Sequence, residues 1–257
     1  MNRYEIGEII DIACRAGKII LENGGEIYRV EDTMQFVCRA FGIEECDSYA
    51  TPTMIVISVS DEKGEVFSRM MRIRRRGVNL NKVEAVNNFS RAILHNPITP
   101  EEAKAKLAAI NNYPVYSFWY MAFAAAVGTS AFTIVFDGGL STFICGFFLG
   151  GFLRLIVDGL NRIQLGFFTV NVIGGAAAAL GGWLFTYLGL IPDWWIITLS
   201  ALMQLVPGLI FTNALRDAAA GDLVSAISRG MEALSIVTAL ASGAGGTLML
   251  LAKLGGG

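Results

Sequence analysis

The sequence has little of what most enzymes and metal-binding proteins depend on. It contains one histidine, His95, and four cysteines, and no two of these residues have the spacing of metal ligands. It has no serine-centred nucleophile motif, no phosphate-cradling glycine loop and no HExxH motif. We therefore expect no catalytic site, no metal, no cofactor and no ATP site. Free thiols in a reducing compartment are the favoured interpretation of the cysteines, and a site made of Cys14, Cys38, Cys46 and His95 is the weaker alternative.

Charge is scarce in the second half of the chain. Of 20 Lys and Arg residues, 15 precede residue 115, and of 22 Asp and Glu residues, 16 precede it. The whole chain is nonetheless 54% hydrophobic, with a mean hydropathy of +0.53. We therefore predict a cytoplasmic α+β domain over residues 1–112, followed over residues 113–257 by an α-helical membrane bundle of about five transmembrane helices.

Five apolar runs approach the length of about 20 residues that a bilayer requires. They cover about 115–136, 139–157, 167–190, 194–214 and 230–251. Arg154 lies near the end of the second run and Arg162 follows it, and Arg216 and Arg229 follow the fourth run. The loops after the first and third runs hold no Lys or Arg. By the positive-inside rule, the N-terminal domain faces the cytoplasm and the C-terminus lies on the other side.

Small residues recur every four positions in two of these runs. They are Gly146 and Gly150 in the second, and Gly174, Ala178 and Gly182 in the third. Each set lines one face of a helix, which favours close helix packing, while a substrate path along these faces is the alternative.

The first domain shows two kinds of periodicity. Apolar residues keep helical spacing from Ile6 to Leu21 and from Ile27 to Phe41. A β-branched run, a turn and an imperfectly alternating run follow at 53–60, 61–64 and 65–73, which predicts a hairpin. Helices are expected at about 79–94 and 100–110, the second after a Thr99 cap.

Two charged groups in this domain have competing interpretations. Arg69, Arg72, Arg74, Arg75 and Arg76 form a basic cluster at the end of a predicted strand. A solvated strand edge is the favoured interpretation, and contact with anionic lipid headgroups is the alternative; nucleic acid is not expected. Glu26, Arg29, Glu31 and Asp32 share one short helix, where ion pairs on its surface compete with a docking surface for the membrane bundle.

The fourth apolar run is interrupted by polar and helix-breaking residues. Pro207 and Gly208 break the helix, and Asn213, Arg216, Asp217 and Asp222 follow within a few turns. Broken helices beside polar residues at membrane depth are typical of transporters. The competing interpretation is a cytoplasmic loop with a satisfied ion pair.

Four segments together resemble the threonine/serine exporter family. They are GGEIYRVEDTM (24–34), ATPTMIVISV (50–59), RRRGVNLNKVEAVNNFSR (74–91) and VPGLIFTNALRDAAAGDLVSAISRGMEA (206–233). The chain looks like the larger subunit of the split, two-subunit form, which implies a smaller membrane partner subunit and an oligomer in a bacterial inner membrane. The fused form of the family is implicated in export of threonine and serine, and the split form in export of succinate.

The resemblance and the residue chemistry select one group of site residues. These are Pro207, Gly208, Asn213, Arg216, Asp217, Gly221 and Asp222, with Glu232 and Arg154 as further candidates for the pathway. Arg216 is expected to bind a substrate carboxylate, and Asp217 or Asp222 to carry a coupling proton or to hold Arg216 when the site is empty. Glu232 is a candidate relay acid, and Arg154 either lines the path or reaches Asp158 and the headgroups.

The predicted function is therefore secondary export. The substrate is a small carboxylate-bearing metabolite, either threonine or serine or a dicarboxylate such as succinate, and the proton gradient is the expected energy source. A membrane-anchored scaffold or regulatory protein that transports nothing is the alternative.

Overall fold

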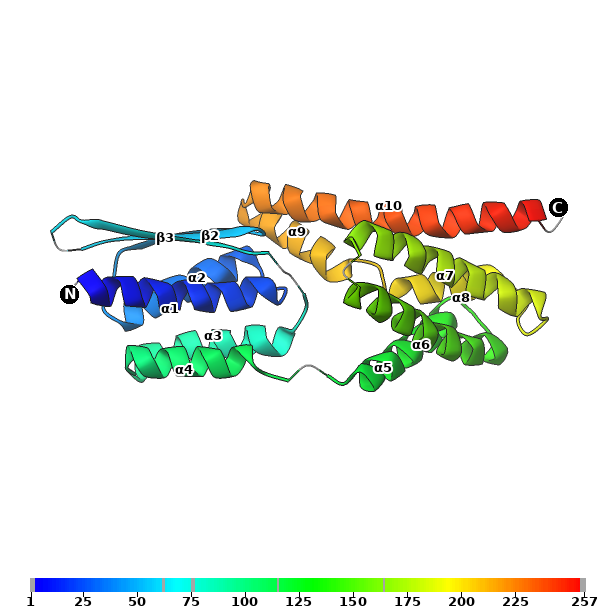
Figure 1. Cartoon of the computed structure of the whole chain (residues 1–257), viewed down its shortest axis with the longest axis horizontal. Helices are drawn as coiled ribbons and strands as arrows, with labels where there is room; N and C mark the ends of the chain where they lie inside the picture. The colour runs from blue at the N-terminus through cyan, green and yellow to red at the C-terminus, as the bar shows by residue number, and fades with distance from the viewer. Residues whose placement is uncertain (1–2, 62, 75–76, 115, 164, 255–257) are drawn as a thin grey trace. The chain divides into compact units, whose positions relative to one another are not determined.

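The computed structural model of the protein describes residues 3–61, 63–74, 77–114, 116–163 and 165–254 (Figure 1). Glu62 of the expected turn, Arg75 and Arg76 of the basic cluster, and Val115 at the expected start of the first span lie outside the described residues. The contacts divide the chain into two compact units. The first is Met1–Val115 with Leu209–Gly230, and the second is Tyr116–Gly208 with Met231–Gly257.

The N-terminal part of the first unit is α+β, as predicted. Its elements are α1 (Arg3–Glu22), α2 (Ile27–Ala40), β1 (Cys46–Thr51), β2 (Met54–Ser60), β3 (Val66–Arg72), α3 (Leu80–His95) and α4 (Pro100–Asn111). The strands form an antiparallel sheet in the order β1-β2-β3. Helices α1 and α2 lie between this sheet and the α3–α4 pair (Figure 1).

The predicted hairpin is confirmed as β2 and β3, with Ile57 opposite Arg69. The prediction omitted β1, whose residues CDSYAT are mostly polar and bury only Ala50. Helix α4 begins with the expected Thr99 cap, in which Thr99 and Glu102 bond each other's backbone N–H groups. Arg72 and Arg74 are exposed, as a solvated edge requires, whereas Arg69 forms an ion pair with Asp11.

Among the described residues, four helices are long and apolar enough to cross a membrane, or five crossings are present if one broken pair is included. The four are α5 (Phe118–Val135), α6 (Leu140–Arg162), α7 (Phe167–Tyr187) and α10 (Leu223–Leu254). The pair is α8 (Trp194–Met203) and α9 (Gly208–Ala220), which are separated at the predicted Pro207 break. Large apolar side chains on these helices, such as Trp119, Phe148 and Phe152, are exposed, as expected of a surface that faces lipid. The protein is therefore a multi-pass membrane protein.

Close packing by small residues is confirmed in the second unit. A Cβ on Gly146 would lie 2.9 Å from Thr133 Cγ2, and a Cβ on Gly150 would collide with Thr129, both on α5. Gly175 of α7 and Gly243 of α10 likewise lie against backbone carbonyl groups, those of Leu240 and Val172. These glycines let neighbouring helices approach more closely than any side chain would permit.

Candidate functional site

Two of the motifs that carry the family resemblance meet in the first unit, although they are about 190 residues apart in sequence. The loop after α1 contributes Gly24, Gly25 and Glu26. The α9 helix and the first turns of α10 contribute Asn213, Arg216, Asp217 and Arg229, and these seven residues are named here the polar cluster. Asn213 is buried, and its Nδ2 donates a hydrogen bond to the carbonyl oxygen of Gly24 at 3.0 Å.

The glycines shape the loop that receives α9. Gly24 has φ +91°, a left-handed conformation that ends α1 and that other residues adopt at a cost. The backbone N–H of Gly25 then bonds Ile20 O at 3.0 Å, and a Cβ on Gly25 would collide with the Ile20 side chain. A Cβ on Gly24 would come within 3.3 Å of Leu209 Cδ2 on α9, so the loop brings its backbone close to α9.

Glu26 joins two arginines. Its Oε1 accepts from Arg216 Nη1 at 2.6 Å, and its Oε2 accepts from Arg29 Nε at 2.8 Å. Burial alone would raise the pKa of Glu26, but the hydrogen bond from Arg29, a backbone N–H and the charges of both arginines outweigh it. The pKa of Glu26 therefore lies below its ordinary value, and the group is an ionised bridge.

Asp217 and Arg229 form a buried ion pair beside this bridge. Arg229 Nε lies 3.1 Å from Asp217 Oδ2, and the two side chains are only 7% and 0% exposed. Arg229 Nη2 also donates to Gly25 O at 2.9 Å. The other oxygen of Asp217 lies 3.5 Å from the backbone N–H of Ile27, so a carboxylate from α9 stands at the positive N-terminal end of α2.

The remaining predicted site residues fall in several places. Pro207 is buried and Gly208 is exposed at the break between α8 and α9. Gly221, with φ +92°, makes the turn from α9 into α10, and the backbone N–H of Asp222 bonds Asp217 O at 2.9 Å. Glu232 is half-buried on α10 and belongs to the second unit.

Arg154 also belongs to the second unit, where its Nε bonds Asp158 Oδ2 at 2.9 Å on the same face of α6. This is the contact expected if Arg154 reaches Asp158.

An acidic group accompanies the cluster on α2. Glu31 accepts the backbone N–H of Ala50 at 2.8 Å, which ties α2 to β1. Burial raises the pKa of Glu31, and the charges of Asp222, Asp32 and Asp217 raise it further, against the opposing effect of the Ala50 N–H. Asp222 is thus one of the charges that raise this pKa, and among the described residues it forms no hydrogen bond or ion pair with Arg216.

Asn213, Arg216 and Asp217 stay predicted site residues, but the acid that holds Arg216 is neither Asp217 nor Asp222. Arg216 pairs with Glu26, and Asp217 pairs with Arg229. The Glu26–Arg29 pair was predicted from its three-residue spacing and is confirmed. The sequence interpretation uses Arg229 only as a loop charge. Arg229 lies within the last of the four matched segments, and this position is the sequence signal that points to it as a site residue.

The comparisons with known proteins identify the family of the chain. A family model described as "Putative threonine/serine exporter" matches residues 11–251, which include every residue of the polar cluster. The chain belongs to the threonine/serine exporter family. The resemblance of the four segments is thereby confirmed over most of the chain.

One relative in the family comes from Mycobacterium tuberculosis (strain ATCC 25618 / H37Rv) and is named "Probable threonine/serine exporter". It is 21% identical over 238 residues, which are 92% of this chain and 45% of the relative. The chain thus spans less than half the length of that exporter. No solved structure matches the chain.

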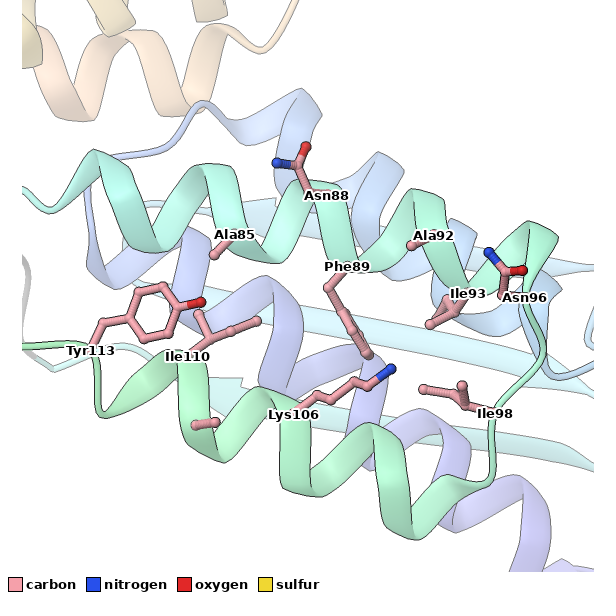
Figure 2. Close-up of a pocket in the computed structure, with 11 residues that line it drawn as sticks. Ala85, Asn88, Phe89, Ala92, Ile93, Asn96, Ile98, Lys106, Ile110 and Tyr113 are labelled. Carbon is pink, nitrogen blue, oxygen red and sulfur yellow. The ribbon is translucent and has the colours of Figure 1, made fainter.

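This member of the exporter family also has a pocket of about 470 Å³ between α3 and α4 (Figure 2). Ala85, Asn88 and Phe89, which line it, belong to the matched segment 74–91. Most of the lining is apolar, and Lys106 is the one charged side chain among the lining residues that the structure describes. The polar cluster therefore offers the richer chemistry for a charged metabolite.

Proposed function

We propose that the protein is a secondary exporter of a small carboxylate-bearing metabolite, with Arg216 as the group that binds the carboxylate. The observation that carries this proposal is the asymmetry of the Arg216–Glu26 pair. The Arg216 side chain is 54% exposed, whereas that of Glu26 is 10% exposed. A guanidinium has five N–H donors, and Arg216 uses Nη1 for Glu26, so an arriving carboxylate can engage the others.

Substrate binding would compete with the bridge to Glu26. Glu26 keeps Arg29 when Arg216 turns to a substrate, so the buried carboxylate retains a cationic partner. Loss of the bridge would loosen the hold of the Gly24–Glu26 loop on α9, the helix that follows the Pro207 break. We infer that this exchange is the step by which a cytoplasmic substrate starts an alternating-access cycle.

Proton coupling is part of the same proposal. Asp217, Asp222 and Glu232 are the acids of the α9–α10 region that could carry a proton, and Arg154 with Asp158 is the charged pair on α6. The family gives no reason to expect an enzyme, and the sequence offers no ATP motif. Threonine, serine and dicarboxylates such as succinate all present the carboxylate that Arg216 would bind.

We further propose a bacterial inner-membrane location with the first unit in the cytoplasm, and a smaller membrane subunit as partner. Support for a partner comes from the resemblance of the four segments to the split, two-subunit form of the family. Reconstitution of this chain in vesicles, alone and with a candidate partner, tests the point. Full flux from this chain alone would remove the partner from the proposal.

The competing function is a scaffold in which the bundle only anchors the first unit. The buried Asp217–Arg229 pair and the hydrogen bond from Asn213 to Gly24 favour the scaffold. Such contacts would hold α9 permanently against the Gly24–Glu26 loop. A scaffold needs these contacts intact but has no use for the donors that Arg216 exposes.

Efflux of threonine, serine and succinate from cells separates the two functions. Arg216→Lys keeps the charge but loses the planar fork that grips a carboxylate, so efflux should fall while membrane abundance stays normal. Arg74→Lys, at an exposed arginine of the same unit, is the matched control and should export normally. Normal efflux of all three substrates by Arg216→Lys would exclude Arg216 as the substrate-binding group, and no efflux from the wild type together with its partner subunit would favour the scaffold.

A further inference from the structure

A second charged cavity lies in the first unit, between α1, β3 and α4. It has a volume of about 430 Å³, and its charged lining residues are Asp11, Arg15, Lys18, Glu22, Arg69 and Lys104. None of them belongs to the polar cluster, and the export proposal gives them no role.

The arginines of this cavity share one anion. Arg15 Nε lies 2.6 Å from Asp11 Oδ2, and Arg69 Nη2 lies 2.6 Å from Asp11 Oδ1. The Asp11 side chain is 12% exposed, whereas those of Arg15 and Arg69 are 57% and 46% exposed. One buried carboxylate thus holds two guanidinium groups in place and balances only one of their charges, while their other N–H groups remain available toward the cavity.

Two lysines add to this positive potential. Lys18 lies 3.7 Å from Glu22, a loose contact, and Lys104 pairs with Glu8. With Glu8 included, four cations face three carboxylates around the cavity. An arrangement of this kind, with two arginines held by Asp11 and a lysine in only a 3.7 Å contact, suits a ligand with two anionic groups.

We propose that this cavity binds a small dianion with carboxylate or phosphate oxygens, held by Arg15, Lys18 and Arg69. Its volume lies within the range of small-molecule pockets and is enough for a four-carbon dicarboxylate or a phosphate together with bound water. The cavity wall includes Glu22, the last residue of α1, and the loop to Gly24–Glu26 starts there. A ligand here therefore sits on the helix that leads into the polar cluster, where it can tune export.

Binding is measured on the purified full chain in detergent, by titration calorimetry with succinate and with inorganic phosphate, at constant ionic strength set with chloride. Wild type should bind at least one of the two, and which one binds identifies the carboxylate or the phosphate as the recognised group. Arg69→Gln should weaken binding at least about tenfold, the effect of one charge-assisted hydrogen bond.

Matched variants keep the result independent of folding. Arg72 lies on the same strand but faces away from Arg69, so Arg72→Gln should bind like wild type. Lys18→Gln leaves the ion pairs of Asp11 with Arg15 and Arg69 intact and should still weaken binding. This variant is needed because Arg69→Gln alone could weaken binding by disturbing Asp11. No binding of either anion by folded wild type, or equal binding by Lys18→Gln, Arg69→Gln and Arg72→Gln, would show that the charges serve only the fold. This experiment measures anion binding and not efflux. The cavity proposal can therefore hold if the export proposal fails, and the export proposal can hold if the cavity binds no anion.

Discussion

At the scale of single residues, the polar cluster divides its charges into two classes. Asp217 and Arg229 are buried together, whereas Arg216 leaves half of its side chain in solvent. Removing one member of a buried ion pair leaves an uncompensated charge, whereas an exposed pair contributes little to stability. The two classes should therefore respond differently to substitution.

Asp217→Ala is expected to lower the stability of the protein by roughly 3–5 kcal/mol, because Arg229 stays buried without its counter-charge. Arg216→Gln should cost at most about 1 kcal/mol, since Glu26 keeps Arg29. Thermal unfolding in detergent and membrane abundance measure both. The double variant Asp217→Ala/Arg229→Leu should lose less than the sum of the single variants, and strict additivity would contradict the pairing.

Glu31 predicts a pH dependence. Its folded-state pKa is raised, so the folded state favours the protonated form. That contribution to stability is present below the ordinary glutamate pKa of about 4.3 and is lost as the pH rises through the folded-state value. Glu31→Gln keeps an oxygen for the Ala50 N–H but cannot ionise. Its Tm relative to wild type should therefore increase between pH 4 and pH 7.

The control for this series is Glu84→Gln, at an exposed acid on α3. Its Tm difference from wild type should stay flat over the same range. A constant or falling difference for Glu31→Gln would show that its burial does not penalise the charge.

At the scale of elements, local sequence patterns predicted helices and strands well and the pairing between them poorly. Helical spacing gave α1 and α2, and Pro207 gave the break before α9, because each depends on residues near in sequence. The contact of α9 with the Gly24–Glu26 loop joins residues about 190 apart, and no periodicity encodes it. The resemblance to the family selected both segments without showing that they touch.

The first-unit boundary illustrates the same limit. Charge density suggested one cut near residue 112, but the compact first unit also contains Leu209–Gly230. Contacts between residues far apart in sequence decide which segments share a compact unit, and charge density does not encode them, so the domain bounds stay a prediction. Which of these residues lie within the bilayer stays a prediction.

Gly24 tests the importance of the loop that receives α9. Gly24→Ala places a Cβ at φ +91° and 3.3 Å from Leu209, so we expect a loss of about 1–2 kcal/mol and a lower Tm. Gly7→Ala is the control, since Gly7 lies inside α1 with no heavy atom near its added Cβ, and it should gain about 0.5–1 kcal/mol. Equal Tm values for the two variants would mean that the loop tolerates a side chain.

At the scale of the whole molecule, the return of the chain to the first unit constrains its topology. When two segments of a chain lie on the same side of a membrane, the chain between them crosses the membrane an even number of times. Between residue 115 and Leu209 lie α5, α6 and α7, each long enough to cross, and α8, which at 10 residues is about 15 Å long, half of a bilayer core. We therefore predict that, if the whole first unit lies on one side of the membrane, the α8 segment and the residues at its break complete a fourth crossing.

The fifth crossing is then α10. Its 32 residues are about 48 Å long, more than a bilayer core needs. Its first turns, to Gly230, belong to the first unit, and the rest from Met231 to Leu254 is still about 36 Å long. Four crossings before α10 and one within it make five, the number expected from the sequence, and the orientation stays a prediction.

Cysteine labelling of intact cells tests this parity without reference to the chain ends. The variants are made in a background without the four native cysteines. A membrane-impermeant maleimide should label Asp193→Cys, in the exposed loop before α8, in intact cells. It should label Ala219→Cys, near the exposed end of α9, only after the cells are permeabilised. The reason is that α8 must carry the chain from the outer side back to the side of the first unit. Labelling of both positions in intact cells would place them on one side, which would make α8 a re-entrant segment and reduce the number of crossings to four.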